Sequence, residues 1–117
     1  MGNELYVGDR ELGQILRIAR DGQALETPEV IASDLDAPEG FLFTDEGLVV
    51  IEAVVGRVLY IDGEGNRREL ANIPPGSPGG ALFPPSNIFN GVAMDNDGTL
   101  FISGETSHSL YRIRAPW

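Results

Sequence analysis

Short apolar runs alternate with segments rich in Gly, Pro and Asp along the whole chain. The clearest example spans residues 90–113, where three apolar runs are separated by a turn at 95–98 and a loop at 104–109. The turn contains Asp97-Gly98, and Gly readily adopts the positive φ that tight hairpin turns need. No window of a dozen residues has an apolar spacing of 3.6 without an interrupting Gly or Pro. The pattern therefore predicts an all-β fold of short antiparallel strands.

An apolar strand pair recurs three times, at residues 5–18, 48–61 and 100–113. The two strands of each pair start ten residues apart, and successive copies start 43 and then 52 residues apart. The longer second interval has room for its additional residues in the Pro- and Gly-rich segment 74–85. A period of about 43 residues is typical of a β-propeller blade, which has four antiparallel strands named A to D outward from the axis.

This repeat predicts ten strands in the order BCD, ABCD, ABC, with the D strand of the first blade near residues 29–32. The corresponding blade units cover about residues 1–36, 37–86 and 87–117 of a single domain, residues 1–117. The first blade would lack its innermost strand and the last blade its outermost strand. Propellers close with about four to eight blades, so the chain would form an incomplete propeller. A small antiparallel sandwich or barrel is the alternative architecture; it has the same strand content but does not explain the repeat.

The composition limits the classes of partner. With 18 acidic and 8 basic residues, the formal net charge is −10, and an acidic surface repels a nucleic-acid backbone. No apolar run approaches the roughly 20 residues that span a bilayer, and the N-terminus lacks the pattern of a signal peptide. We therefore expect no nucleic-acid or membrane partner, and a cytoplasmic location by default. The chain has no Cys, which excludes disulfides and thiolate metal sites.

Strand direction assigns the connecting loops to two ends of the blades. The A–B and C–D turns are rich in Asp-Gly and Glu-Gly pairs, whose acids we expect to form turns by bonding their own backbone. The B–C and D–A loops bring polar side chains to the opposite end, and the ligand-binding candidates there are Glu52, Asn87, Glu105 and His108. Carboxylate and amide oxygens near an axis suit Ca²⁺. The alternative is that independent polar loops share a solvated rim.

Two segments resemble those of known propeller families. The segment 38–43, Pro-Glu-Gly-Phe-Leu-Phe, looks like the acidic entry segment of a gluconolactonase-like blade, and residues 87–97 are similar to that family's Asn-Gly-x-Ala segment. The chain thus resembles the six-bladed gluconolactonase-like and NHL-repeat propellers. Residues 70–113 are also similar to glutaminyl cyclotransferase propellers. The gluconolactonase resemblance implies a metal-dependent lactonase in which Asn90 and Glu39 would be metal ligands.

Two functions follow from these observations. The first is a scaffold of unassigned activity that binds a protein partner or a small molecule. The second is a metal-dependent lactonase that uses the loops around Asn90 and Glu39, with Ca²⁺ as the candidate ion. Because three blades cannot close around an axis, apolar blade faces would stay exposed in a monomer. We therefore expect a homodimer with six blades, unless the chain is part of a longer propeller.

Overall fold

The computed structural model describes residues 3–72, 89–104 and 109–114 of the 117-residue chain. The ten strands are β1 (Leu5–Asp9), β2 (Gln14–Arg20), β3 (Gln23–Ala32), β4 (Pro38–Phe43), β5 (Gly47–Glu52), β6 (Arg57–Asp62), β7 (Arg67–Asn72), β8 (Phe89–Met94), β9 (Leu100–Gly104) and β10 (Ser109–Ile113). In the described part of the chain, no helix is long and apolar enough to cross a membrane.

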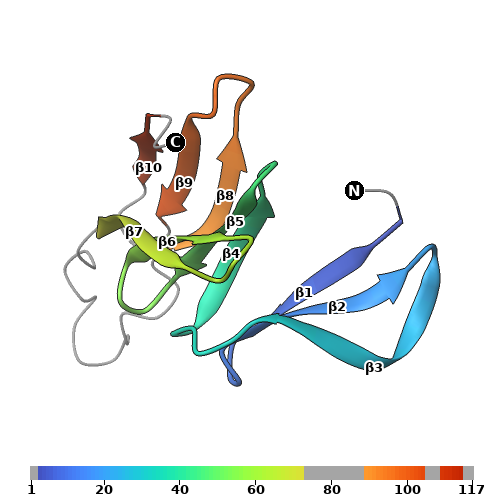
Figure 1. The fold of residues 1–117 in the computed structure, drawn as a ribbon. Helices are drawn as coiled ribbons and strands as arrows, with labels where there is room; N and C mark the ends of the chain where they lie inside the picture. The colour runs from blue at the N-terminus through green and yellow to red at the C-terminus, as the bar shows by residue number, and fades with distance from the viewer. Residues whose placement is uncertain (1–2, 73–88, 105–108, 115–117) are drawn as a thin grey trace.

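The strands form three antiparallel sheets in which neighbours in sequence are neighbours in space (Figure 1). The first sheet is β1-β2-β3, the central sheet is β4-β5-β6-β7, and the third sheet is β8-β9-β10. The all-β class and the antiparallel pairing confirm the prediction from sequence, and the strands follow the predicted order. Only the central sheet has four strands; the other two have three.

The middle strands of the central sheet, β5 and β6, are buried on both faces. Leu48 and Val50 of β5 pack toward the first sheet, whereas Val49 and Ile51 pack toward the third sheet. Because successive side chains of a strand point to opposite faces, a strand between two other sheets must be apolar at every position. This explains why residues 48–51 form an uninterrupted run of Leu, Val and Ile.

The first strands of the three sheets lie near one another. Strand β4 lies against β8, and β1 contacts β4 (Figure 1). At the β1–β4 contact, a Cβ on Gly8 would lie 3.6 Å from the ring of Phe41. The later strands of each sheet extend away from this region (Figure 1).

Two of the acidic turns form as predicted, whereas Thr44 Oγ1 accepts the backbone hydrogen bonds of the β4–β5 turn. Asp62 Oδ1 accepts hydrogen bonds from the backbone N–H groups of Glu64 and Asn66, both at 2.9 Å. Asp95 Oδ1 accepts the equivalent pair, also at 2.9 Å, from the residues two and four positions later. The β6–β7 and β8–β9 hairpins therefore share one turn geometry. The prediction that these acids stabilise turns is confirmed for both residues.

The β2–β3 turn makes the first sheet longer than expected. Asp21 and Gly22 have φ values of 53° and 76°, the pair of positive angles that a type I′ hairpin turn requires. Arg20 pairs directly with Gln23 across this turn, so β3 begins there and not near residue 29, where the sequence predicted the strand. The Asp-Gly pair predicted the turn. The sequence analysis did not predict that a two-residue turn lets β3 begin immediately after it.

Candidate functional site

Three loops at one end of the strands are joined by backbone hydrogen bonds. The β3–β4 loop is in the middle: Leu35 N donates to Gly13 O of the β1–β2 loop at 3.0 Å. At its other side, Ala53 N of the β5–β6 loop donates to Ala37 O at 3.1 Å. The described loops that were predicted to share one end therefore do so. We call this group of loops, residues 10–13, 33–37 and 53–56, the loop end.

Glu52, a predicted ligand-binding residue, is completely buried at the loop end. Its Oε2 accepts a hydrogen bond from Asp36 N at 2.7 Å, and its Oε1 accepts one from Arg57 Nε. The hydrogen bond to Glu52 raises the pKa of Arg57. Both carboxylate oxygens are thus used within the chain, where they hold the β3–β4 loop against the central sheet.

Glu39, a predicted metal ligand, forms an ion pair at the start of β4. Its Oε1 lies 3.2 Å from Arg10 Nε of the β1–β2 loop, and both side chains are partly exposed. The pair therefore connects the first sheet to the central sheet. A guanidinium at this distance repels a second cation, so a metal ion at Glu39 would have to displace Arg10.

Glu39 and Asn90 occupy equivalent backbone positions. The β4–β5 register passes from Pro38 to Gly40 and shifts at Glu39. The β8–β9 register shifts in the same way between Phe89 and Gly91, at Asn90. Bulges of this kind redirect a side chain and are frequent beside binding sites. Since β4 lies against β8, the two predicted ligands belong to neighbouring strands.

The remaining predicted site residues, Asn87, Glu105 and His108, lie outside the described residues. The side chain of Asn90 is also outside the description, although its backbone belongs to β8. Within residues 3–72, 89–104 and 109–114, no group of three His, Asp or Glu side chains is placed to hold a metal ion.

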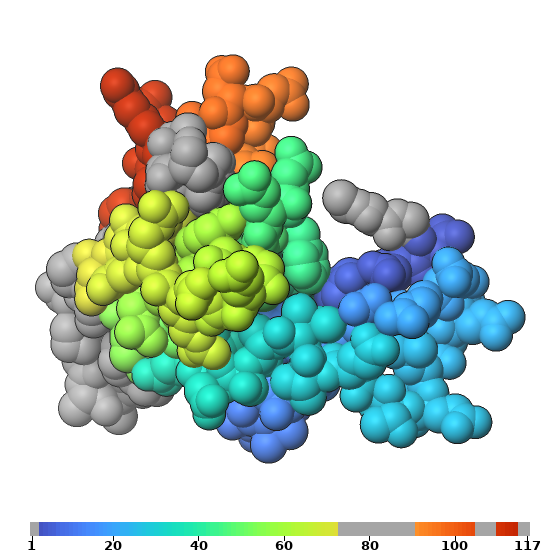
Figure 2. All heavy atoms as spheres, in the orientation of Figure 1, coloured from blue at the N-terminus to red at the C-terminus, as the bar shows by residue number. Residues whose placement is uncertain are grey.

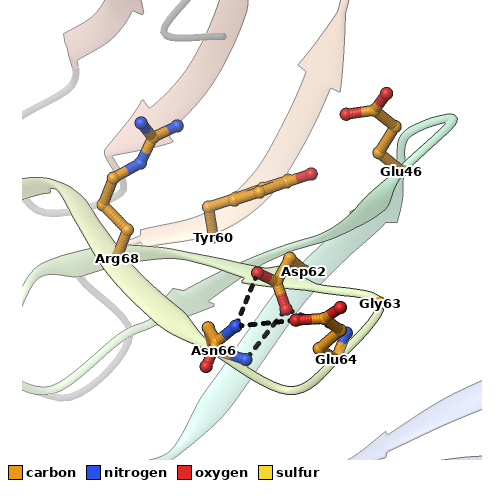
Figure 3. Close-up of a pocket in the computed structure, with 7 residues that line it drawn as sticks. All are labelled: Glu46, Tyr60, Asp62, Gly63, Glu64, Asn66 and Arg68. Atoms are coloured by element: carbon orange, nitrogen blue, oxygen red, sulfur yellow. Dashed lines mark hydrogen bonds between the residues drawn. The ribbon is translucent and has the colours of Figure 1, made fainter.

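A hollow of about 620 Å³ lies at the opposite end of the central sheet, beside the β6–β7 turn (Figure 3). The ring of Tyr60 lies between Arg68 and Glu46 in this view, and the Arg68 guanidinium carbon is 5.6 Å from the ring centroid. The other residues that line the hollow are Asp62, Gly63, Glu64 and Asn66. The Asn66 side chain donates to Asp62 at 3.0 Å and lowers the pKa of that carboxyl group. The acids beside the hollow thus stabilise the turn.

Sequence reasoning missed the basic partners of the loop-end acids. Glu52 and Arg57 are directly paired across the β5–β6 hairpin, and opposite charges on facing strand positions attract each other. Because Glu52 and Arg57 stand on either side of a short loop, their spacing in the sequence could have predicted the ion pair. Arg10 and Glu39 are 29 positions apart in different sheets, so only the three-dimensional arrangement reveals that pair.

Comparison with protein families finds no family model that matches the chain, and comparison with curated proteins finds no match. Two ion pairs, Arg10–Glu39 and Arg57–Glu52, lie beside the described loop end, whose loops are linked through their backbones. These contacts attach the loops to two sheets. The Arg10–Glu39 pair is partly exposed, and Asp34 and Asp36 of the β3–β4 loop are exposed as well.

Proposed function

We propose that the chain is a segment of a β-propeller and acts as a scaffold that binds a protein partner or a small molecule at its loop end. The main support is that equivalent residues of the repeat face in equivalent directions. Leu48 of the central sheet packs toward the first sheet, and its equivalent, Leu100 of the third sheet, packs toward the central sheet. This directional order of sheets is the arrangement that successive blades of a propeller require.

The positions of the first strands also support this proposal. In a propeller the A strands line the axis, and here the two expected A strands, β4 and β8, lie against each other. The equivalent bulges at Glu39 and Asn90 would then lie close to the axis at the loop end. A binding scaffold needs loops that keep their shape, and the buried carboxylate of Glu52 keeps the β3–β4 loop in place.

The lactonase alternative is less well supported by this geometry. It requires Glu39 to bind a cation, whereas the carboxylate is already paired with Arg10. The net charge of −10 would attract Ca²⁺ to the surface in general, so weak binding alone would not identify a site. A specific site would depend on Glu39 in particular.

The test compares the wild type with Glu39→Gln, using Ca²⁺ and glucono-δ-lactone as probes. If the chain is a scaffold, we expect millimolar Ca²⁺ to change the melting temperature of both proteins equally. Ca²⁺ bound at Glu39 of the folded state would instead raise only the wild-type melting temperature. We also expect lactone hydrolysis at the rate of buffer alone. A Ca²⁺-dependent hydrolysis rate that disappears in Glu39→Gln would refute the scaffold and establish the lactonase.

A further inference from the structure

We infer that the outward face of the first sheet packs against the outward face of the third sheet of a second copy, so that two chains close a ring of six sheets. This inference rests on the proposed propeller arrangement and names the partner that completes it. The first and third sheets lie on opposite sides of the central sheet, coloured blue to cyan and orange to red in Figure 2.

In the described part of the chain, no sheet covers the outward apolar face of the first sheet. Ile15 of β2 is buried against the central sheet, so alternation directs its neighbour Leu16 to the other face. Val7 and Val30 pair with Leu16 from the two flanking strands and share that face. Leu5, two positions before Val7, is 56% exposed, whereas its equivalent in the central sheet, Leu48, is 4% exposed. The same repeat position is therefore buried wherever a preceding sheet covers it.

In the third sheet, no described strand covers the opposite face, the one that would meet a following sheet. Leu100 and Ile102 of β9 are buried against the central sheet, so Phe101 points to the other side. Leu110 of β10 is 68% exposed, whereas its equivalent in the central sheet, Val58, is 1% exposed and packs toward the third sheet. Leu110 thus occupies a repeat position that is buried wherever a following sheet covers it.

The two outward faces are complementary in type. We call the face of a sheet that points toward the following sheet its forward face, and the face that points toward the preceding sheet its backward face. Each junction within the chain joins the forward face of one sheet to the backward face of the next sheet. Among the described strands, none covers the backward face of the first sheet or the forward face of the third sheet. A second copy supplies both missing partners at once, through two identical head-to-tail junctions related by a two-fold axis. Six sheets lie within the range of about four to eight that closes a propeller.

The exposed area agrees with a missing partner. The accessible surface is 7195 Å², about 1,000 Å² more than the roughly 6,200 Å² expected for a compact monomer of 12.6 kDa. A standard specific interface covers about 800 Å² on each partner. The excess area of one chain is therefore sufficient for its share of a stable dimer.

The test begins with light scattering at micromolar concentration on the wild type, Leu5→Asp and Leu110→Asp. We expect the wild type to have twice the chain mass of 12.6 kDa and each variant to have the single-chain mass. Both side chains are more than half exposed in the chain, so far-UV circular dichroism should remain unchanged. Leu12→Asp is the matched control: Leu12 is also 68% exposed, but it lies in the β1–β2 loop, and we expect this variant to remain a dimer.

Mixing the two monomeric variants tests the head-to-tail arrangement. A pair made from one Leu5→Asp chain and one Leu110→Asp chain has one junction with both faces unaltered, so mixing should restore the dimer mass. If the dimer instead joined two copies of the same face, only one of the two substitutions would lie in the junction. The other variant would then remain a dimer, and mixing would not restore the dimer mass of the first. A monomeric wild type with a cooperative melt, or a wild-type assembly larger than two chains, would overturn the inference. The calcium and lactone experiment would still decide the proposed function separately.

Discussion

Glu52 accepts hydrogen bonds from Arg57 Nε and from the backbone of Asp36, and it connects the central sheet to the preceding loop. Its carboxylate is completely buried, whereas the Arg57 side chain is 38% exposed. Removing the partner of a buried charge costs more than neutralising that charge, because the remaining charge has lost its access to water. The two residues of this pair should therefore respond differently to substitution.

We expect Arg57→Met to lower the free energy of unfolding by about 2–4 kcal/mol, since it leaves the Glu52 carboxylate buried without its cation. Glu52→Gln retains a side-chain acceptor and allows Arg57 to reach solvent, so its cost should be about 1 kcal/mol. Urea unfolding measures both values. As a control, Arg20→Met breaks an exposed pair with Glu29 and should stay within about 0.5 kcal/mol of wild type. Equal losses for Arg57→Met and Glu52→Gln would contradict this account of the pair.

Two glycines with positive φ differ in the space around them. At Gly13, with φ of 68°, a Cβ would lie 2.2 Å from the carbonyl oxygen of Leu35. At Gly22, with φ of 76°, a Cβ would meet nothing within 4 Å. We expect Gly22→Ala to cost about 1 kcal/mol through backbone strain alone, and Gly13→Ala to cost about 3 kcal/mol because the loops must also separate. Similar urea midpoints for the two variants would show that the loop-end contact is looser than described.

The pKa of Asp62 is lowered, chiefly by the hydrogen bond from the Asn66 side chain. A lowered pKa in the folded state means that the ionised carboxylate favours folding. This contribution is present above the unfolded value of about 3.9, and it is lost as the pH falls through the folded pKa. We expect Asn66→Ala to weaken the loss of stability below about pH 4, measured as urea midpoints from pH 5 to pH 2. Asn96→Ala, in the equivalent β8–β9 turn, is the control and should retain the wild-type pH dependence.

Burial on both faces should make β5 the slowest of the described strands to open. Amide hydrogen exchange reports such local opening, which ranges from nearly free at frayed edges to the global unfolding free energy in the core. We expect the amides of Val49, Val50 and Ile51 to exchange at least about 100-fold more slowly than the paired amides of the edge strands β1 and β10. Equal protection in β1 and β5 would mean that the sheets unfold as a single unit.

The strand pattern was predictable because it depends on short-range features. Apolar runs bounded by Asp-Gly and Gly-rich turns predicted ten strands in the observed order, and the repeat predicted which strands are equivalent. The boundary of β3 was missed because it depends on one turn type. The burial of Glu52 was also not predictable from the pattern, because a Glu at the end of an apolar strand can face either solvent or the interior.

The charge pairs at the loop end could be predicted only in part. Glu52 and Arg57 face each other across a short hairpin, a relationship that strand spacing contains. Arg10 and Glu39 meet only because the first sheet packs beside the central sheet, and no local pattern specifies that geometry. The Tyr60–Arg68 contact at the hollow likewise depends on which face of β6 and β7 each residue occupies.

The alternating faces of β5 have a consequence for insertions and deletions. Because Leu48 and Val49 point to different neighbouring sheets, deleting one residue inside the strand would exchange every side chain beyond the deletion between the two interfaces. A change of length in a loop has no such effect, since the alternation of side chains between the two faces starts anew in each strand. The repeats can therefore differ in spacing, 43 against 52 residues, because the additional residues of the second interval lie between β7 and β8 and not inside β5. Inside β5, by contrast, one residue more or less decides which of the two interfaces every later side chain of the strand enters.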